Sequence, residues 1–264
     1  MAETDVLYDV SERIATITLN RPEARNALSS EVLRQLPERM TQAEADPDVD
    51  VLILTGTDPA FCAGLDLKEL GTTGGILGGG RAEAESARRG GPIPSMQVPL
   101  IGAINGAAIG GGLCLALALD VRLAAPGAYF RAAGINNGLT ASELGLSYLL
   151  PRAIGSSRAA EIMLTGRDVD AVEAERIGLV SSIVPEDELL ERCYDMADRI
   201  QAFSRPGIEL TKRTLWTGLD AGSLEQHMYQ EGMGQLFVRM MTDNFEEATR
   251  ARKEKRPAVF RDTR

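Results

Sequence analysis

The sequence predicts an α/β protein in which strands and helices alternate and an all-helical part follows. Short apolar runs alternate with helical patterns over the first two thirds of the chain, and helical patterns alone continue from Pro185. Such alternation is typical of stacked βαβ units with right-handed crossovers. The 264 residues are enough for one core with a helical appendage, and we expect the core over residues 1–198 and the appendage over residues 199–264.

The first third of the chain predicts a hairpin, a helix and two buried strands. The runs "VLYDV" and "IATITLN" flank a turn at Ser11–Arg13 and indicate a β-hairpin. A helix is expected from Ser29, with Ser29 or Ser30 as N-cap and Pro37 as a local defect. The almost wholly apolar runs "VDVLILTG" and "PLIGAING" predict strands that are buried on both faces.

The glycine-rich stretch 71–95 predicts a mobile surface segment, partly helical over residues 82–88, that is a candidate cover for a ligand. Further elements follow Asp120. We expect strands at "VRLAA" and "AYFRAA", helices over residues 156–164 and 171–177, a strand at "GLVSSIV", and helices from there to the end.

Composition excludes several classes of protein. A net charge of −10 argues against a nucleic-acid partner, and an anionic small molecule would need a local basic patch. The cysteines, Cys62, Cys114 and Cys193, are widely spaced and His227 is the single histidine, which fits neither a disulfide framework nor a metal site. We expect a cytoplasmic protein, since no signal pattern and no run of about 20 apolar residues is present, and no membrane partner.

The stretch "NGAAIGGGLCLALALD", residues 105–120, carries three consecutive glycines at the start of an apolar helical pattern. It lacks both the G-x-G-x-x-G order and the Lys-Ser/Thr of nucleotide-binding loops. The first amides of a helix have no internal partner, and glycine allows a substrate oxygen to approach them. The loop "AFCAGLDLKEL", residues 60–70, offers a second such amide at the small residues Ala63 and Gly64. Two converging amides at about 3 Å from an oxygen form an oxyanion hole.

The chain resembles the crotonase, or enoyl-CoA hydratase/isomerase, superfamily nearly from end to end. The similar motifs are "LNRPEARNAL", "FCAGLDLKEL", "INGAAIGGGLCLALALDVRLAA", "GLSYLLPRAIG", "LTGR", "ERIGLVSSIVP" and "EKRPAVF". The resemblance implies an α/β fold, a crotonase-like spiral of ββα units with an α-helical C-terminal region. It also implies that residues 199–264 form a trimerisation region, which gives homotrimers or dimers of trimers.

The same resemblance implies a binding site for an acyl-CoA substrate and no separate cofactor or metal. The amides of Ala63 and Gly111 would hold the thioester carbonyl and stabilise its enolate. Coenzyme A would run past two segments and past the basic tail of a neighbouring subunit. The residues implied are Arg25 and Ala27, then Ala63, Gly64, Leu65, Asp66 and Leu67, together with Gly111, and Lys255 and Phe260 of the tail.

Hydration of an enoyl thioester needs one carboxyl group to activate water and another to deliver a proton. At the two positions where the family's hydratases carry glutamates, this chain has Cys114 and Gly134. Glu143 remains, with two interpretations: an acid in the first turn of a helix capped by Thr140 or Ser142, or, as the resemblance to the isomerases implies, a proton shuttle. One carboxylate suffices to move a double bond while amides hold the enolate.

The other ionisable groups are interpreted as structural. Asp66 and Asp120 are expected to tether the two loops, Cys114 to be a small core residue, and His227 to be structural or interfacial. Three functions stay open: double-bond isomerisation through Glu143, which is favoured; enoyl-CoA hydration in fatty-acid β-oxidation through Glu143 and an ordered water; and, from another class, acyl-CoA binding without catalysis.

Overall fold

The computed structural model describes residues 4–70 and 96–261, and begins with a β-hairpin. Strands β1 (Val6–Ser11) and β2 (Ile14–Leu19) pair in antiparallel register. The intervening Glu12 and Arg13 both have positive φ, at 50° and 67°, the conformation that tight two-residue hairpin turns require. The predicted hairpin is confirmed. The glycine-rich stretch 71–95, with its expected helix, lies outside the described residues.

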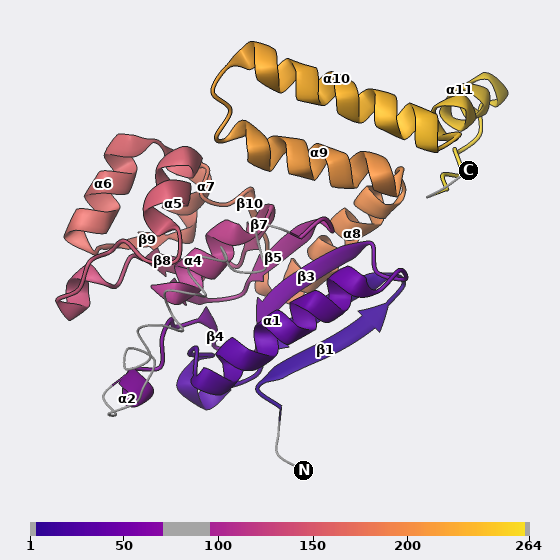
Figure 1. Ribbon diagram of the computed structural model, residues 1–264. Helices are drawn as coiled ribbons and strands as arrows, with labels where there is room; N and C mark the ends of the chain where they lie inside the picture. The colour runs from indigo at the N-terminus through magenta and orange to yellow at the C-terminus, as the bar shows by residue number, and fades with distance from the viewer. Residues whose placement is uncertain (1–3, 71–95, 262–264) are drawn as a thin grey trace.

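A six-stranded sheet forms the centre of the molecule, in the order β1-β2-β3-β5-β7-β10 (Figure 1). From β2 onward its strands run parallel. All residues of β3 (Val51–Gly56) and β5 (Leu100–Ile104) are buried, which confirms the two apolar runs as central strands. The sheet is completed by β7 (Val121–Ala124) and the short β10 (Ser182–Ile183). The predicted strand "GLVSSIV" is therefore reduced to these two residues.

A second, four-stranded sheet lies beside the first; of its strands only β8 (Tyr129–Arg131) was predicted, within "AYFRAA", and the sheet itself was not predicted. Its order is β4-β6-β8-β9, with β4 (Ala60–Cys62), β6 (Ala107–Ile109) and β9 (Asp168–Asp170). Each of the three repeating units places one strand in the large sheet, the next in the small sheet, and then a helix. These helices are α2 (Leu67–Leu70), α4 (Gly111–Ala118) and α5 (Leu146–Ile154). The described chain thus contains the ββα units that the resemblance implies.

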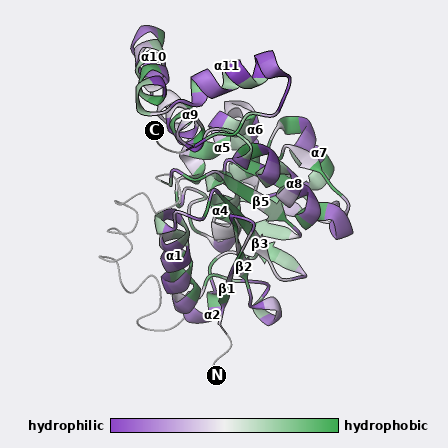
Figure 2. Ribbon diagram, turned by 90° about the vertical axis from the view of Figure 1, so that its right-hand side faces the viewer, coloured by the Kyte–Doolittle hydropathy of each residue, from purple (hydrophilic) through white to green (hydrophobic). Residues whose placement is uncertain are grey.

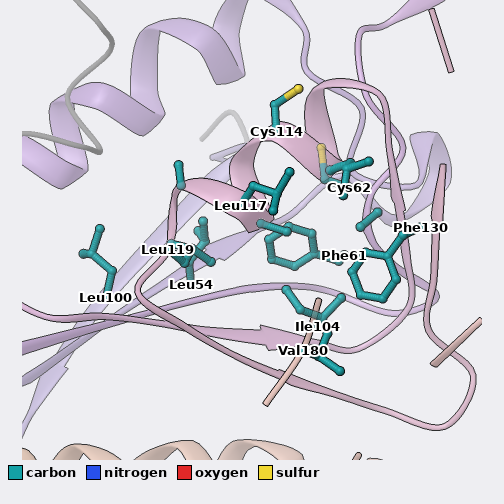
Figure 3. Close-up of a cluster of buried hydrophobic side chains, with 14 of the residues drawn as sticks. Leu54, Phe61, Cys62, Leu100, Ile104, Cys114, Leu117, Leu119, Phe130 and Val180 are labelled. Carbon is teal, nitrogen blue, oxygen red and sulfur yellow. The ribbon is translucent and has the colours of Figure 1, made fainter. Parts of the chain in front are cut away.

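Helices cover both faces of the large sheet (Figures 1 and 2). Along β3, Val51 and Ile53 face one apolar cluster while Leu52 and Leu54 face the other, the alternation expected of a strand. Helix α8 (Leu189–Gln201) packs on the first face, against β3, β5 and β7. The second face carries the larger cluster, whose Phe61, Phe130, Cys62 and Cys114 appear in Figure 3. This cluster lies directly behind the loops of the candidate site.

The remaining helices of the core follow the sequence expectations closely. Helix α1 (Ser30–Ala45) contains Pro37, and its N-cap is Ser29, whose hydroxyl accepts a hydrogen bond from the amide of Val32. Helices α6 (Ser156–Thr165) and α7 (Ala171–Ile177) lie where they were predicted. Short 3₁₀ turns are found at Pro22–Ala24, Ile135–Asn137 and Glu186–Glu188. Among the described residues, no helix is long and apolar enough to cross a bilayer.

The C-terminal helices extend away from the sheets (Figure 1). Helix α9 (Arg205–Gly218) and α10 (Leu224–Met241) pack on each other, and α11 (Asn244–Glu254) follows. The predicted helices to the end of the chain stop at Glu254, where Lys255 takes a left-handed conformation that ends the helix. The expected boundary between residues 198 and 199 falls inside α8, and the division itself stays a prediction.

A polar cluster of the partly buried Asp120 and Trp216 with the buried Lys212 attaches α9 to the sheet. One carboxylate oxygen of Asp120 accepts from Lys212 Nζ and from the amide of Leu100, each at 2.8 Å, and the other accepts from Trp216 Nε1 at 2.8 Å. Lys212 is 6% exposed and also donates to the carbonyl of Val98. The predicted tethering role of Asp120 is confirmed, although it ties α9 to β5 and β7 as well as holding the loop after α4.

Replacement of Asp120 tests this attachment. We expect Asp120→Ala to lower the free energy of unfolding by about 3–5 kcal/mol, because it leaves the Lys212 ammonium buried without a carboxylate. Urea unfolding followed by circular dichroism measures the change. The matched control is Arg34→Ala, which removes exposed pairs with Glu31 and Glu38 and is expected to cost at most about 1 kcal/mol. Equal losses in the two variants would contradict the anchoring role.

Candidate active site

The glycine triplet lies where β6 passes into α4, and each of its members needs a bare backbone for a different reason. Gly110 has φ +52° and ψ −116°, a conformation that side chains exclude. A Cβ at Gly111 would come within 2.8 Å of Leu28 Cδ1, and a Cβ at Gly112 within 2.0 Å of the carbonyl oxygen of Cys62. The end of strand β4 and the start of helix α4 are therefore in direct main-chain contact.

The loop after β4 meets the triplet at Gly64. This residue has φ +88°, and a Cβ on it would lie 2.6 Å from the carbonyl oxygen of Ile109 and 3.4 Å from the amide nitrogen of Gly111. The two loops that the sequence singled out are in contact, as predicted. Gly111 is the first residue of α4, and its N–H has no acceptor within residues 4–70 and 96–261.

Hydrogen bonding contradicts the prediction that the Ala63 amide is the second donor. The N–H of Ala63 donates to the carbonyl of Arg25 at 3.0 Å and is therefore occupied. The neighbouring residues Gly64 and Asp66 bond to Leu28 from either side of Leu65, at 2.7 and 3.1 Å. In such a parallel bridge the residue between the two bonds turns its own N–H to the opposite side. The Leu65 N–H has no acceptor in the described parts of the chain, so the geometry favours Leu65 over Ala63.

Asn26 fixes the segment that supplies the acceptor for Ala63. Its side-chain amide is buried and donates to the carbonyls of Thr57 and Ala60 at 2.7 and 2.6 Å, and its Oδ1 accepts from the amide of Arg21. Both Arg25 and Asn26 have positive φ, at 51° and 56°, which turns the chain sharply towards β4. The motif "RPEARNAL" is thereby pinned to the connection between β3 and β4.

Arg21 joins the same segment to Asp66. Its Nη1 donates to the carbonyl of Ala27 at 2.8 Å and to the carboxylate of Asp66 at 3.0 Å. Burial raises the pKa of Asp66, but the hydrogen bonds from Arg21 and from the amide of Lys68 outweigh it and leave that pKa below its ordinary value. The predicted tethering role of Asp66 is confirmed.

Glu143 lies on the other side of the triplet. A Cβ at Gly110 would be 3.5 Å from Glu143 Oε1, so the carboxylate is next to the peptide that carries the Gly111 N–H. The side chain is half-buried, and burial raises its pKa above the ordinary value. Helix α5 begins only at Leu146, with Gly145 as N-cap and no side-chain cap. The interpretation of Glu143 as a first-turn acid capped by Thr140 or Ser142 is therefore wrong.

Cys114 and Gly134, the two positions where the resemblance implies glutamates in hydratases, both lie in tightly packed surroundings. Cys114 is 4% exposed, and its Sγ lies 3.5 Å from the carbonyl oxygen of Glu143, to which the thiol donates. Burial, with the nearby Glu143 carboxylate, raises the pKa of the Cys114 thiol well above its ordinary range. It is the small core residue that was predicted. A Cβ at Gly134 would come within 2.0 Å of the carbonyl oxygen of Thr140, so no side chain fits there.

Comparison with known proteins agrees with this geometry. A family model described as enoyl-CoA hydratase/isomerase matches residues 9–263. The chain belongs to the enoyl-CoA hydratase/isomerase family. It is an enzyme of the lyase or isomerase type, and its fold is the crotonase fold.

Three relatives from mycobacteria illustrate the family. The crystal structure of a probable enoyl-CoA hydratase/isomerase from Mycobacterium abscessus is 60% identical, with a TM-score of 0.90, over 98% of this chain and 100% of that one. A monofunctional enoyl CoA isomerase from M. smegmatis is 57% identical, with a TM-score of 0.71, over 86% of this chain and 99% of that one. The probable enoyl-CoA hydratase EchA12 of Mycobacterium tuberculosis is 57% identical over 262 residues, covering 94% of this chain and 90% of its own length.

The structure does not bring the tail residues to the same loops. Phe260 lines a hollow of about 440 Å³ with Asp50 and Pro99, which precede β3 and β5, whereas the candidate site follows these strands. Lys255 ends α11. The contact of Lys255 and Phe260 with a neighbouring subunit's coenzyme A, as the family resemblance implies, stays a prediction.

The remaining predicted residues divide between the mouth of the site and distant elements. Arg25 and Leu67 are exposed beside the loops, while Ala27 and Gly64 are buried in them. His227 lies on α10, with Nε2 3.8 Å from the Glu231 carboxylate, which agrees with a structural role. In the described residues, no cluster of three or more His, Cys, Asp or Glu side chains is arranged to hold a metal ion.

Gly112 tests the backbone contact at the centre of the site. We expect Gly112→Ala to destabilise the protein by about 1–3 kcal/mol or more, because the added methyl group collides with a backbone carbonyl that cannot move aside alone. Gly127→Ala is the matched control, since a Cβ there meets nothing within 4 Å. Unfolding in urea compares the two. A Gly112→Ala protein as stable as the control would show that β4 and α4 are not in such close contact.

Proposed function

We propose that this enzyme moves a carbon–carbon double bond in an acyl-CoA thioester, converting a 3-enoyl-CoA into a 2-enoyl-CoA, with Glu143 as the proton shuttle. The observation that carries the proposal is the position of the Glu143 carboxylate beside Gly110. It lies next to the amide of Gly111, which has no acceptor among the described residues. Cys114, and Gly134 with no room for a side chain, stand where the family resemblance implies carboxylates in a hydratase.

The proposed reaction needs one carboxylate and two amides. The amides of Gly111 and Leu65 donate to the thioester oxygen, and Glu143 removes a proton from C2. The electrons of that C–H bond form a dienolate whose charge rests on the oxygen. The protonated Glu143 then returns the proton to C4, which leaves the double bond between C2 and C3. Each oxyanion donor contributes about 3–4 kcal/mol to such a transition state, and no oxidant or reductant is consumed.

The raised pKa of Glu143 suits both steps of this transfer. A carboxylate with an ordinary pKa is a weak base, and a pKa closer to the working pH makes the group a stronger base and still a competent acid. The second loop carboxylate, Asp66, is committed to Arg21 and has a lowered pKa, which suits a tether rather than a proton shuttle.

A second candidate is hydration of a 2-enoyl-CoA in fatty-acid β-oxidation, through Glu143 and an ordered water. The name of the M. tuberculosis relative favours it, the name of the M. smegmatis relative favours isomerisation, and the M. abscessus relative is named for both reactions. The packing at Gly134 favours isomerisation, because hydration by two carboxyl groups needs a second acid and Gly134 has no room for one.

Coenzyme A is proposed to pass the mouth formed by Arg25, Ala27 and residues 63–67. The exposed Arg25 guanidinium supplies positive charge in an acidic protein, and the left-handed backbone at Arg25 holds it at this edge. Since coenzyme A belongs to the substrate and the transfer is redox-neutral, the proposed reaction requires no further cofactor or metal.

The C-terminal helices are proposed to assemble the chain into trimers or dimers of trimers. Large apolar side chains are exposed along α10 and its neighbours, as an unfilled subunit interface would present them. They include Leu215, Leu219, Leu224, Met228, Tyr229, Met233, Leu236, Phe237, Met240, Met241 and Phe245. In this assembly Lys255 and Phe260 would reach the coenzyme A of a neighbouring subunit.

Glu143→Gln tests the proton shuttle. With a 3-enoyl-CoA, the rise in absorbance of the conjugated thioester is expected to slow by about 10²–10⁴-fold, because the amide cannot accept the C2 proton. KM should change little, since the amides of Gly111 and Leu65 remain. The neighbouring Ser142→Ala serves as a control. An unchanged rate in Glu143→Gln would show that another residue transfers the proton.

The same absorbance separates the candidate functions. Loss of the conjugated thioester from a 2-enoyl-CoA would indicate hydration. No change with either substrate across chain lengths, together with measurable coenzyme A binding, would leave a binding protein without catalysis.

The pH dependence of kcat/KM tests the environment of Glu143. Only the carboxylate form is a base, so we expect kcat/KM to fall as pH falls through the pKa of Glu143, with a midpoint above the ordinary value of about 4.3. Stability has the opposite sign: a raised pKa favours the folded state at low pH, and this contribution is lost as pH rises through the folded-state pKa. A midpoint at or below the ordinary glutamate value would contradict the half-buried placement.

A further inference from the structure

Leu144 combines a disfavoured backbone with an exposed apolar side chain, directly next to the candidate base. Its φ is +44°, and among the described residues the other non-glycine residues with positive φ are all polar or charged. The side chain is 57% exposed. Glycine would adopt this backbone without strain, and leucine gains little burial within the chain to offset it. Neither the backbone conformation nor burial within the chain therefore accounts for a leucine at this position.

The position of the Leu144 side chain beside the glycine triplet gives a functional reason for it. A Cβ at Gly111 would lie 3.8 Å from Leu144 Cδ1, and a Cβ at Gly110 would lie 3.5 Å from Glu143 Oε1. The peptide between these two glycines carries the N–H proposed to hold the enolate oxygen. Consecutive side chains of one loop thus flank this peptide, with the carboxylate beside Gly110 and the isobutyl group beside Gly111.

The loop is held in this arrangement from both ends. The carbonyl of Glu143 accepts from the thiol of Cys114 and from the amide of Leu146 at 2.7 Å. Gly145, with φ +86°, then turns the chain into α5. These bonds hold the peptide before Leu144 and the start of α5, and in this arrangement Leu144 Cδ1 lies beside Gly111.

We propose that Leu144 is a specificity-determining residue that excludes water from the space between Glu143 and the bound enolate. This inference rests on the proposed isomerisation. A proton taken from C2 and held on Glu143 can either return to C4 or exchange with water before it does so. An apolar wall at Gly111, closed further by the acyl chain, favours the return and denies water access to the dienolate.

The experiment follows the fate of the transferred hydrogen. A 3-enoyl-CoA that carries deuterium on both C2 positions is converted in ordinary water, and mass spectrometry measures the deuterium found at C4 of the 2-enoyl product. We expect the unmodified protein to retain a measurable fraction of the label. Leu144→Ala removes the wall, and Leu144→Gly removes both the wall and the strain. Both variants should continue to isomerise but retain several-fold less label.

Two further variants make the result specific. Leu144→Met restores an apolar side chain of similar length and is expected to restore retention. Leu7→Ala removes a partly exposed leucine on the distant strand β1 and should leave retention unchanged. If the isomerisation rate falls sharply in Leu144→Gly but not in Leu144→Ala, the cause is a loosened loop. Loss of the apolar wall would affect both variants.

The outcomes separate a failure of the role of Leu144 from a failure of the proposed isomerisation. No 2-enoyl product from the unmodified protein would overturn the proposed isomerisation, and the role of Leu144 with it. Isomerisation without any retained label, or equal retention in the unmodified protein and both the alanine and glycine variants, would overturn the role of Leu144 and leave the isomerisation standing.

Discussion

The site depends on one close backbone contact, between the end of β4 and the start of α4. Gly112 approaches the Cys62 carbonyl so closely that no Cβ fits, and in the loop after β4 Gly64 approaches Ile109 and Gly111 in the same way. Because both sides of this contact are main chain, the positions of the neighbouring amides follow from the pairing of β4 with β6 rather than from side-chain rotamers. Donors fixed in this way need no reorganisation when charge develops on a substrate oxygen.

The polar residues around the site serve this contact. Asn26 and Arg21 bind the segment before α1 to the β3–β4 connection and to Asp66, and so they hold the loop after β4 against the triplet. Asn26 also fixes the turn that contains Arg25, and the carbonyl of Arg25 accepts a hydrogen bond from the amide of Ala63. The same network therefore decides which amide of the loop is left for a ligand.

This dependence explains what could be predicted from the sequence. Strands β3 and β5, helix α1 and the convergence of the two glycine loops follow from apolar periodicity, a serine cap and glycine placement. The three-residue strands β4 and β6 are too short to show a period of two, and they were missed, whereas β8 was predicted within "AYFRAA". The choice between Ala63 and Leu65 depends on the directions in which successive N–H groups point in the loop after β4, which residue types do not encode. The helix cap near Glu143 was misplaced because Leu144 and Gly145 turn left-handed, and a leucine gives no signal for that conformation.

The replacement of the hydratase carboxylates is built into the packing and is not confined to two side chains. At Gly134 the chain from Ile135 to Thr140 folds back until the Thr140 carbonyl fills the space of a side chain. At Cys114 the thiol packs in the apolar cluster and supports the loop that carries Glu143. A glutamate at position 114 would bring a second carboxylate into a buried place next to Glu143, where desolvation and like charge both oppose ionisation. Hydration by two carboxyl groups at these positions would therefore require the 134–140 turn and the Glu143 loop to move together, and the proposed reliance on Glu143 follows from the backbone at Gly134 and the packing at Cys114.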